Sequence, residues 1–219
     1  MGRIQKYGIF GLVCTLGLWF SSHAAADLVI HLKDGRTLRV DVRKEDFMGM
    51  SFEAGSANAS QPVTWDFETG NLKGWTRTGE AFNNQPTFGD NPTARNRGQA
   101  SGHQGQYWIG TYENRPGPSD PAGGIQGDGP QGTLTSAPFT IRNSRISFLI
   151  GGGCDLTSQR VELLVQGEAV RKTTGECHET MKRISWDIGA LMGKQAQIRI
   201  VDASSGGWGH INVDDFRFE

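Results

Sequence analysis

Residues 160–173, Arg-Val-Glu-Leu-Leu-Val-Gln-Gly-Glu-Ala-Val-Arg-Lys-Thr, carry the pattern that decides the fold. Apolar and polar residues alternate with a period close to two on both sides of Gln166-Gly167. A period of two places successive side chains on opposite faces of a strand, and a Gly-containing dipeptide between two such runs is typical of a tight turn. The stretch therefore predicts two antiparallel strands joined by a short turn.

Similar runs follow one another through the rest of the second half, at residues 139–141, 145–150, 183–188 and 196–201. No window shows a helical period beyond a few residues at 188–192. Short strands at this spacing, without alternating helices, predict an all-β fold, a β-sandwich of the jelly-roll type.

The N-terminus has the pattern of a signal peptide. Arg3 and Lys6 precede an apolar run at residues 9–20, and an Ala-x-Ala site ends at Ala26. The apolar run is shorter than the ~20 residues that span a bilayer, so we expect no membrane span in the mature chain. We expect cleavage near Ala26 and a secreted or periplasmic protein.

The remaining sequence divides into three parts. Residues 27–53 alternate on both sides of Asp34-Gly35, which predicts a small β-hairpin appendage with a third strand near residues 48–52. Residues 54–62 lack large apolar side chains and have the composition of a flexible linker. The main domain then covers residues 63–219.

Charge and cysteine content narrow the function classes. Without residues 1–26 the formal charge changes from −1 to −3, and no basic stripe is left for nucleic acid. Cys154 and Cys177 are an even pair in an exported chain, which predicts one disulfide, the alternative being two separately buried thiols. The chain-entropy model gives such a bridge a stabilisation of about 3 kcal/mol.

The end of the chain, residues 206–216, reads Gly-Gly-Trp-Gly-His-Ile-Asn-Val-Asp-Asp-Phe. A glycine-rich turn with an aromatic and a histidine passes into a strand with paired carboxylates. Upstream, residues 65–75 contain the motif Phe-Glu-x-Gly-x-Leu-x-Gly-Trp. Further motifs occur in order at residues 132–141, 146–153, 186–188 and 193–194.

In order and spacing, these motifs resemble the lectin-like fructan-binding module that is attached to levanases and other fructan-active glycoside hydrolases. The resemblance covers about residues 64–219 and implies a β-sandwich that binds sugar, a fructan or a terminal fructose, without cleaving it. It also implies a sugar site of acidic residues and an arginine. Nothing in the 219 residues resembles the catalytic propeller of those hydrolases.

We expect the sugar site among residues at strand ends and in glycine-rich turns, because sugars need fixed polar partners and aromatic surfaces. The alternatives are a functionally silent surface salt bridge for the charged residues and a plug at the end of the sandwich for the tryptophan. The candidate ligand-binding residues are Arg171, Glu179, Asp202, Trp208, His210, Tyr112 and Glu113. The irregular segment 80–132 should frame this site.

Glu68 near the first strand of the domain, and Asp214 and Asp215 in the last strand, are candidate ligands of a structural Ca²⁺. Carboxylate oxygens suit this ion, and the first and last strands of a jelly roll commonly lie side by side. The alternative is that the carboxylates pair with Arg77 or Arg217. No organic cofactor is expected.

Three functions remain. The first is a secreted, non-catalytic sugar-binding protein. The second is a structural or adhesion protein whose residues 27–53 dock to a cell-envelope partner. A stand-alone glycoside hydrolase is the weakest, because no Ser-His-Asp, His-Glu-x-x-His or Gly-x-Ser-x-Gly signature is present. We therefore expect no enzyme activity.

Overall fold

The computed structural model describes residues 16–17, 25–31, 37–43 and 64–219. The chain forms two compact units, residues 1–56 and residues 57–219. Among the described residues, none of the helices has the length and apolar character that crossing a bilayer requires.

The N-terminal unit contains a small antiparallel sheet in which β2 (Ala25–His31) lies between β1 (Leu16–Gly17) and β3 (Thr37–Arg43). Ile30 pairs with Leu38 and Asp27 pairs with Asp41, so the predicted β-hairpin is confirmed. Its third strand is β1. The predicted turn at Asp34-Gly35, the strand near residues 48–52 and the linker 54–62 lie outside the described residues.

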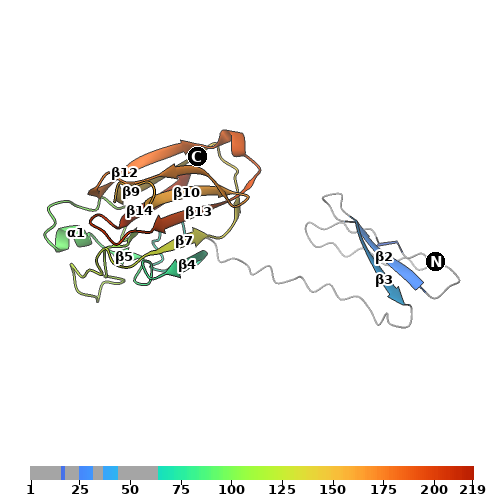
Figure 1. Ribbon diagram of the computed structural model, residues 1–219, viewed down its shortest axis with the longest axis horizontal. Coiled ribbons are helices and arrows are strands. Elements are labelled where there is room, and N and C mark those ends of the chain that lie inside the picture. Colours follow the sequence, from blue (N-terminus) through green and yellow to red (C-terminus); the bar gives the residue numbers. More distant parts are fainter. Residues whose placement is uncertain (1–15, 18–24, 32–36, 44–63) are drawn as a thin grey trace. The chain divides into compact units, whose positions relative to one another are not determined.

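Residues 64–219 form the predicted β-sandwich of two antiparallel sheets (Figure 1). One sheet has the order β11 (Glu168–Thr173), β10 (Gln159–Val165), β13 (Gln195–Asp202), β7 (Gly132–Ser136) and β4 (Trp75–Gly79), with β8 (Phe139–Thr140) also pairing with β13. The other has the order β12 (His178–Asp187), β9 (Arg145–Gly152), β14 (Ile211–Phe218), β6 (Tyr107–Gly110) and β5 (Thr87–Phe88).

The hairpin of β10 and β11 is present where the sequence predicts it. Gln166 and Gly167 both have positive φ, 54° and 84°. A two-residue turn of this kind matches the right-handed twist of the flanking strands, so Val165 pairs directly with Glu168. The short helical segment expected near residues 188–192 is a 3₁₀ turn at Gly189–Leu191.

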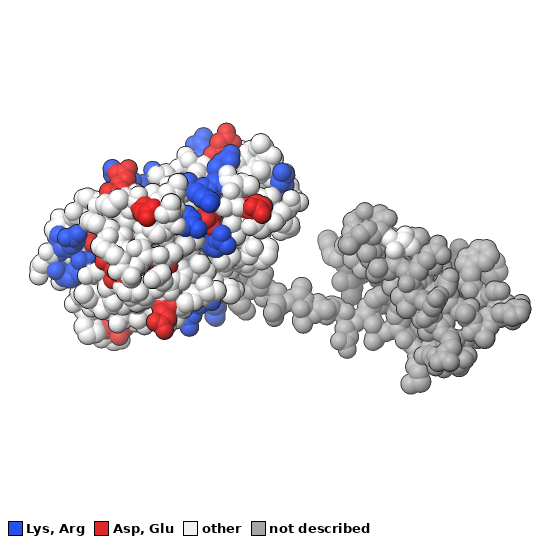
Figure 2. All heavy atoms as spheres, in the orientation of Figure 1, with Lys and Arg blue, Asp and Glu red and all other residues white. Residues whose placement is uncertain are grey.

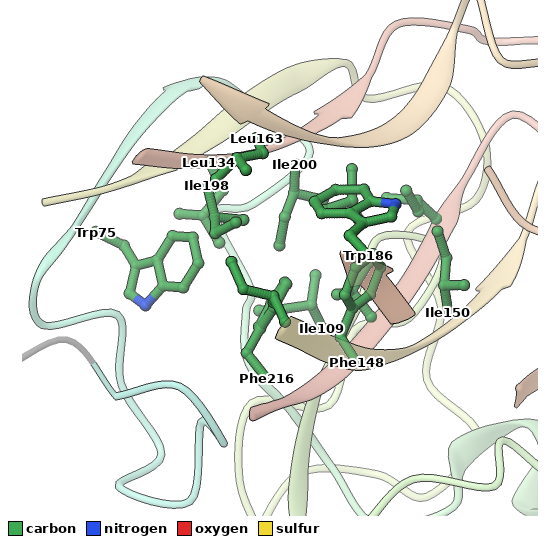
Figure 3. Close-up of a cluster of buried hydrophobic side chains, with 14 of the residues drawn as sticks. Trp75, Ile109, Leu134, Phe148, Ile150, Leu163, Trp186, Ile198, Ile200 and Phe216 are labelled. Carbon is green, nitrogen blue, oxygen red and sulfur yellow. The ribbon is translucent and has the colours of Figure 1, made fainter. Parts of the chain in front are cut away.

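The core lies between the two sheets and consists of the inward-facing set of each alternating pattern (Figure 3). Leu163 of β10 and Ile198 and Ile200 of β13 are fully buried and belong to the same cluster as Phe148 of β9. Trp75 and Trp186 are buried in this core, and Trp65 packs against it. Trp108 is buried in a separate small cluster with Leu149 and Met181.

The predicted pairing of the first and last strands is wrong. β4 pairs with β7, and β14 lies between β9 and β6. The segment ahead of β4 does reach the last strand, because the Phe216 N–H donates to the Trp65 carbonyl at 2.9 Å. The prediction failed because the chain that lies beside the last strand is the irregular segment ahead of β4 and not the first strand itself.

The predicted disulfide is confirmed. Cys154 and Cys177 are bonded, with their Cα atoms 4.9 Å apart. Cys154 lies in the connection between β9 and β10, and Cys177 directly precedes β12. The bridge therefore joins two connections that each run from one sheet to the other.

The surface carries interspersed basic and acidic side chains (Figure 2). Glu162 of β10 is almost completely buried beneath Arg160 and Arg199, which bond its two oxygens at 2.6 Å each. These ion pairs lie on the outer face of the sheet, because Glu162 alternates with the core residues Val161 and Leu163.

Candidate functional site

Six charged side chains meet at one end of the sandwich, and we call them the charged cluster. Four come from the irregular segment 80–132, one of them at the C-terminal end of α1, and two lie at the starts of β12 and β14. The cluster consists of Arg95, Arg97, Glu113, Asp128, Glu179 and His210. Segment 80–132 therefore supplies most of the charged cluster, and its role as the frame of a sugar site stays a prediction.

The short helix α1 (Asn91–Ala94) positions the two arginines. The Asp90 side chain accepts the Thr93 N–H at 3.3 Å and caps the helix, and Pro92 stands in its first turn. Asn91 is fully buried and donates to the Gly124 carbonyl at 2.7 Å. The helix is thereby fixed against the far part of the same segment, and the chain leaves it at Arg95.

Glu179 lies in a β-bulge at the start of β12. This edge strand pairs with β9 at His178 and again only from Lys182 onward. The Glu179 N–H donates instead to the Gln99 side chain at 3.0 Å, and Asn212 of β14 donates to the Glu179 carbonyl at 3.0 Å. Bulges at sheet edges redirect a side chain, and here the carboxylate points into the cluster.

Arg95 joins the two glutamates. Its Nη2 donates to Glu113 Oε1 at 2.9 Å and to Glu179 Oε1 at 2.7 Å. Both carboxylates are nearly inaccessible, with side chains 0% and 2% exposed, whereas the Arg97 side chain is 40% exposed and bonds Glu179 through Nε at 3.2 Å. Burial raises the pKa of Glu113 despite its bonds to Arg95 and Asn91. The two carboxylates are thus buried and fixed, whereas Arg97 presents a positive charge at the surface.

His210 connects Asp128 and Glu179. Its Nδ1 lies 2.7 Å from Asp128 Oδ1, and its Nε2 lies 3.5 Å from Glu179 Oε2. Burial alone would lower the pKa of His210, but the two carboxylates raise it to about 9. Burial would likewise raise the pKa of Glu179, but His210 and Arg95 lower it to about 2. The imidazolium form is therefore favoured at neutral pH.

Two aromatic rings flank the cluster. The Trp208 ring stacks beside His210, with centroids 5.5 Å apart, and Arg97 lies 5.1 Å from the Trp208 ring. Tyr112 lies 5.1 Å from the His210 ring and 4.7 Å from the Arg95 guanidinium. Both rings are half-buried. Each ring therefore contacts charged groups of the cluster and still has exposed surface.

Trp208 has an unusual backbone conformation, with φ of 61°. For a bulky residue this left-handed conformation is rare, and it persists only where the surroundings impose it. The Gly209 N–H donates to the Gly206 carbonyl at 2.8 Å, which closes a tight turn around the tryptophan. Such strain is concentrated at functional sites, and it sets the indole beside Arg97 and His210.

Asp202 lies behind the cluster at the end of β13. It is 1% exposed, and both of its carboxylate oxygens are buried without a hydrogen-bond partner among residues 64–219. Burial raises the pKa of Asp202 to about 7, although the nearby Thr111 hydroxyl, the Ser204 backbone and the charge of His210 act to lower it. Asp202 is thus a buried neighbour of the cluster, and its carboxylate is not accessible to a ligand.

The structure brings together six of the seven predicted ligand-binding residues. They are Tyr112, Glu113, Glu179, Asp202, Trp208 and His210. The placement of Arg171 in this site is wrong. Arg171 lies on the edge strand β11 and donates to the Asp187 carbonyl at 3.0 Å, at the opposite end of β12 from Glu179. Eight residues of strand at about 3.3 Å each separate the two ends.

The arginines of the cluster, Arg95 and Arg97, were not predicted, and neither was Asp128. A local signal for the arginines exists, because Asp90-Asn91-Pro92 has the N-cap and first-turn proline that begin a helix. No local pattern marks Asp128, which reaches His210 across 82 residues of sequence.

The three predicted calcium ligands do not share one set of partners. Asp214 accepts the Gln104 N–H at 2.8 Å and Glu68 accepts the Gln106 N–H at 2.9 Å, so both carboxylates face the same loop. Asp215 does not fit the ligand set, because it pairs with Arg183 and with Arg217, the latter at 2.6 Å. Within residues 64–219, no three His, Cys, Asp or Glu side chains are grouped as a metal site requires.

Comparison with known proteins gives one sequence relative and several structural neighbours. The "Putative glycosyl hydrolase ecdE" of Aspergillus rugulosus is 36% identical over 183 residues, which cover 79% of this chain and 24% of that protein. The chain therefore spans about a quarter of the length of this relative. No family model matches the sequence.

Among solved structures, the module TmCBM61 in complex with β-1,4-galactotriose is 16% identical, with a TM-score of 0.42, over 73% of this chain and 99% of that one. The K1 adhesin domain of Lys-gingipain from Porphyromonas gingivalis is 12% identical, with a TM-score of 0.42, over 70% of this chain and 95% of that one.

Proposed function

We propose that residues 64–219 are a non-catalytic sugar-binding module and that its ligand contacts the charged cluster. The observation that carries this proposal is the position of His210 between the rings of Trp208 and Tyr112, with Arg97 beside the Trp208 ring and Asp128 bonded to His210 Nδ1. Sugars present many hydroxyl groups and little apolar area, so they bind where rigid donors and acceptors stand next to an aromatic ring.

The charge balance of the cluster fits a neutral ligand. Arg95, Arg97 and protonated His210 face three carboxylates, so the charges cancel. A charge-balanced site offers charged hydrogen-bonding groups, which are stronger partners than neutral ones, without attracting a polyanion.

Accessibility points to Arg97 and Asp128 as the first groups that a ligand meets. The Arg97 side chain is 40% exposed and its bond to Glu179 uses only Nε, while the Asp128 side chain is 22% exposed. The guanidinium thus has donors left for ligand hydroxyl groups, and the carboxylate can accept from others.

Fructan is the sugar class that we propose, on the motifs shared with fructan-binding modules. The fungal relative supports a role beside a hydrolase, because the matching region is 24% of a protein named as a glycosyl hydrolase. The proposed location of the mature protein is outside the cytoplasm, with residues 1–26 removed.

Calorimetric titration of the full chain with levan, inulin and fructose tests this function. We expect saturable heat with at least one of them and binding at least tenfold weaker for Arg97→Gln. Arg171→Gln is the matched control, because Arg171 is an exposed arginine outside the cluster. Flat titrations of folded protein, or equal losses in both variants, would contradict the proposal and favour the envelope-adhesion function through residues 27–53.

Hydrolysis is the second candidate. Glu113 and Glu179 bond the same Arg95 nitrogen, and retaining glycosidases use two carboxyl groups at close range. Burial of both carboxylates, together with the low pKa of Glu179, makes a proton-donating pair unfavourable. Release of reducing sugar from levan or inulin by the wild-type protein, abolished in Glu113→Gln, would establish this activity instead.

A further inference from the structure

Each cysteine of the disulfide is next to an anchor of the charged cluster. Cys154 follows Gly153, whose N–H donates to the His210 carbonyl at 2.8 Å. Cys177 stands two residues before Glu179. The covalent bond therefore ties together the two segments that bring His210 Nε2 within 3.5 Å of Glu179 Oε2.

The other contacts on this side of Glu179 are few. The β12 ladder has one pair, His178 with Gly152, before the bulge. Thr174 Oγ1 adds a hydrogen bond to the Gly153 carbonyl at 3.1 Å. On the far side of Glu179, the strand is held by the segment 99–101, for example by the Met181 N–H, which donates to the Ser101 carbonyl at 2.8 Å.

We propose that the Cys154–Cys177 disulfide positions Glu179 and His210, so that sugar binding exists in the oxidised protein and is switched off by thiols. This inference rests on the proposed function. A dithiol supplies two electrons: one thiolate attacks a cystine sulfur and forms a mixed disulfide, and its second thiol then displaces the other protein thiol. The products are two cysteine thiols and a cyclic disulfide.

The bond is open to this reaction, and the sandwich does not depend on it for its core. Cys154 is exposed and Cys177 is half-buried. The core cluster between the sheets contains neither cysteine and is built from residues such as Phe148, Leu163 and Ile200. Reduction should therefore loosen the segment before Glu179 while the two sheets stay packed.

The test compares oxidised and dithiothreitol-reduced full-length protein in which Cys14, the third cysteine of the sequence, is replaced by serine (Cys14→Ser). Sugar affinity is measured by calorimetry, folding by near-ultraviolet circular dichroism, and the titration of His210 by NMR. We expect affinity to fall at least tenfold in the reduced, folded protein and to return on reoxidation. The pKa of His210 should fall from about 9 toward its ordinary value, because Glu179 moves away.

Controls separate positioning from general damage. Cys154→Ala/Cys177→Ala should bind weakly with or without dithiothreitol, whereas Thr174→Val loses one hydrogen bond, keeps the disulfide and should retain affinity. Unchanged affinity and an unchanged His210 titration after complete reduction would overturn the inference, as would loss of the folded circular dichroism signal. If oxidised protein binds no sugar, the proposed function fails, and the His210 titration still decides whether the disulfide positions the cluster.

Discussion

His210 Nδ1 lies 2.7 Å from Asp128 Oδ1, across 82 residues of sequence. This contact joins the irregular segment between β6 and β7 to the turn that begins β14. Because His210 also faces Glu179, the two carboxylates together favour the protonated form of the imidazole.

Asp128→Asn should lower the pKa of His210 from about 9, because an uncharged amide no longer stabilises the imidazolium. A raised histidine pKa contributes stability that is complete below the ordinary value and lost as the pH rises through 9, so the variant should lose stability near pH 7. NMR titration of the histidine ring measures the shift. Asp120→Asn, a substitution of a half-buried aspartate in the same segment, should leave His210 unchanged. An identical titration in both variants would refute the coupling.

The strained turn at Trp208 predicts the relative stability of two variants that both lack the indole ring. Asn tolerates positive φ far better than Ala, so Trp208→Asn should be more stable than Trp208→Ala by about 1 kcal/mol. Both variants lack the ring beside Arg97 and His210, and both should lose sugar affinity. Urea unfolding and calorimetric titration give the two readouts. A more stable Ala variant would show that the positive φ does not determine the stability of substitutions at this position.

The sequence predicts most of the sandwich because one face of each strand is buried, and burial leaves an alternating pattern. It also indicates Glu179, Trp208 and His210, which stand at strand ends or in a glycine-rich turn. Arg171 was misplaced because alternation gives the face of a strand but not the end of the sheet at which its partners lie. The path of segment 80–132 depends on distant contacts such as Asn91 with Gly124, which no local pattern reveals.

The structure does not test the calcium prediction, which stays a prediction for two of its three carboxylates. Asp214 faces the same loop as Glu68, whereas Asp215 is engaged with Arg183 and Arg217. We expect Ca²⁺ to raise the melting temperature of the wild-type chain, Asp214→Asn to abolish that rise and Asp215→Asn to keep it. Differential scanning fluorimetry with Ca²⁺ or with a chelator is the measurement. A wild-type melting temperature that does not respond to Ca²⁺ would end the prediction.

Ile200 is fully buried between the sheets, on β13 near Leu134 (Figure 3). On its other side it pairs with Val161 of β10. Ile200→Ala should lower the free energy of unfolding by about 2–5 kcal/mol, because it removes buried methyl groups and leaves a cavity. Lys194→Ala, in an exposed turn, should stay within about 0.5 kcal/mol of the wild type. Urea denaturation compares the two. Equal small effects would mean that the core collapses around the missing side chain.

Asp202 predicts a pH-dependent stability difference that substitution can isolate. Burial holds its pKa at about 7, above the ordinary value of 3.8, so the folded state binds the proton more tightly than the unfolded chain. The stabilisation that Asp202 contributes is complete below pH 3.8 and is lost as the pH rises through 7.

Asp202→Asn cannot ionise and should gain stability relative to the wild type as the pH rises from about 4 to about 7, a range set by these two values. Urea unfolding at several pH values gives this difference directly, and the titrations of His210 and Glu179 enter both proteins and largely cancel. Asp187→Asn, an exposed aspartate at the far end of β12, should run parallel to the wild type. If the Asp202→Asn curve also ran parallel to the wild type, the Asp202 carboxylate would be ionised and stabilised in the folded protein. The charge of His210 would then stabilise this carboxylate more strongly than its burial suggests.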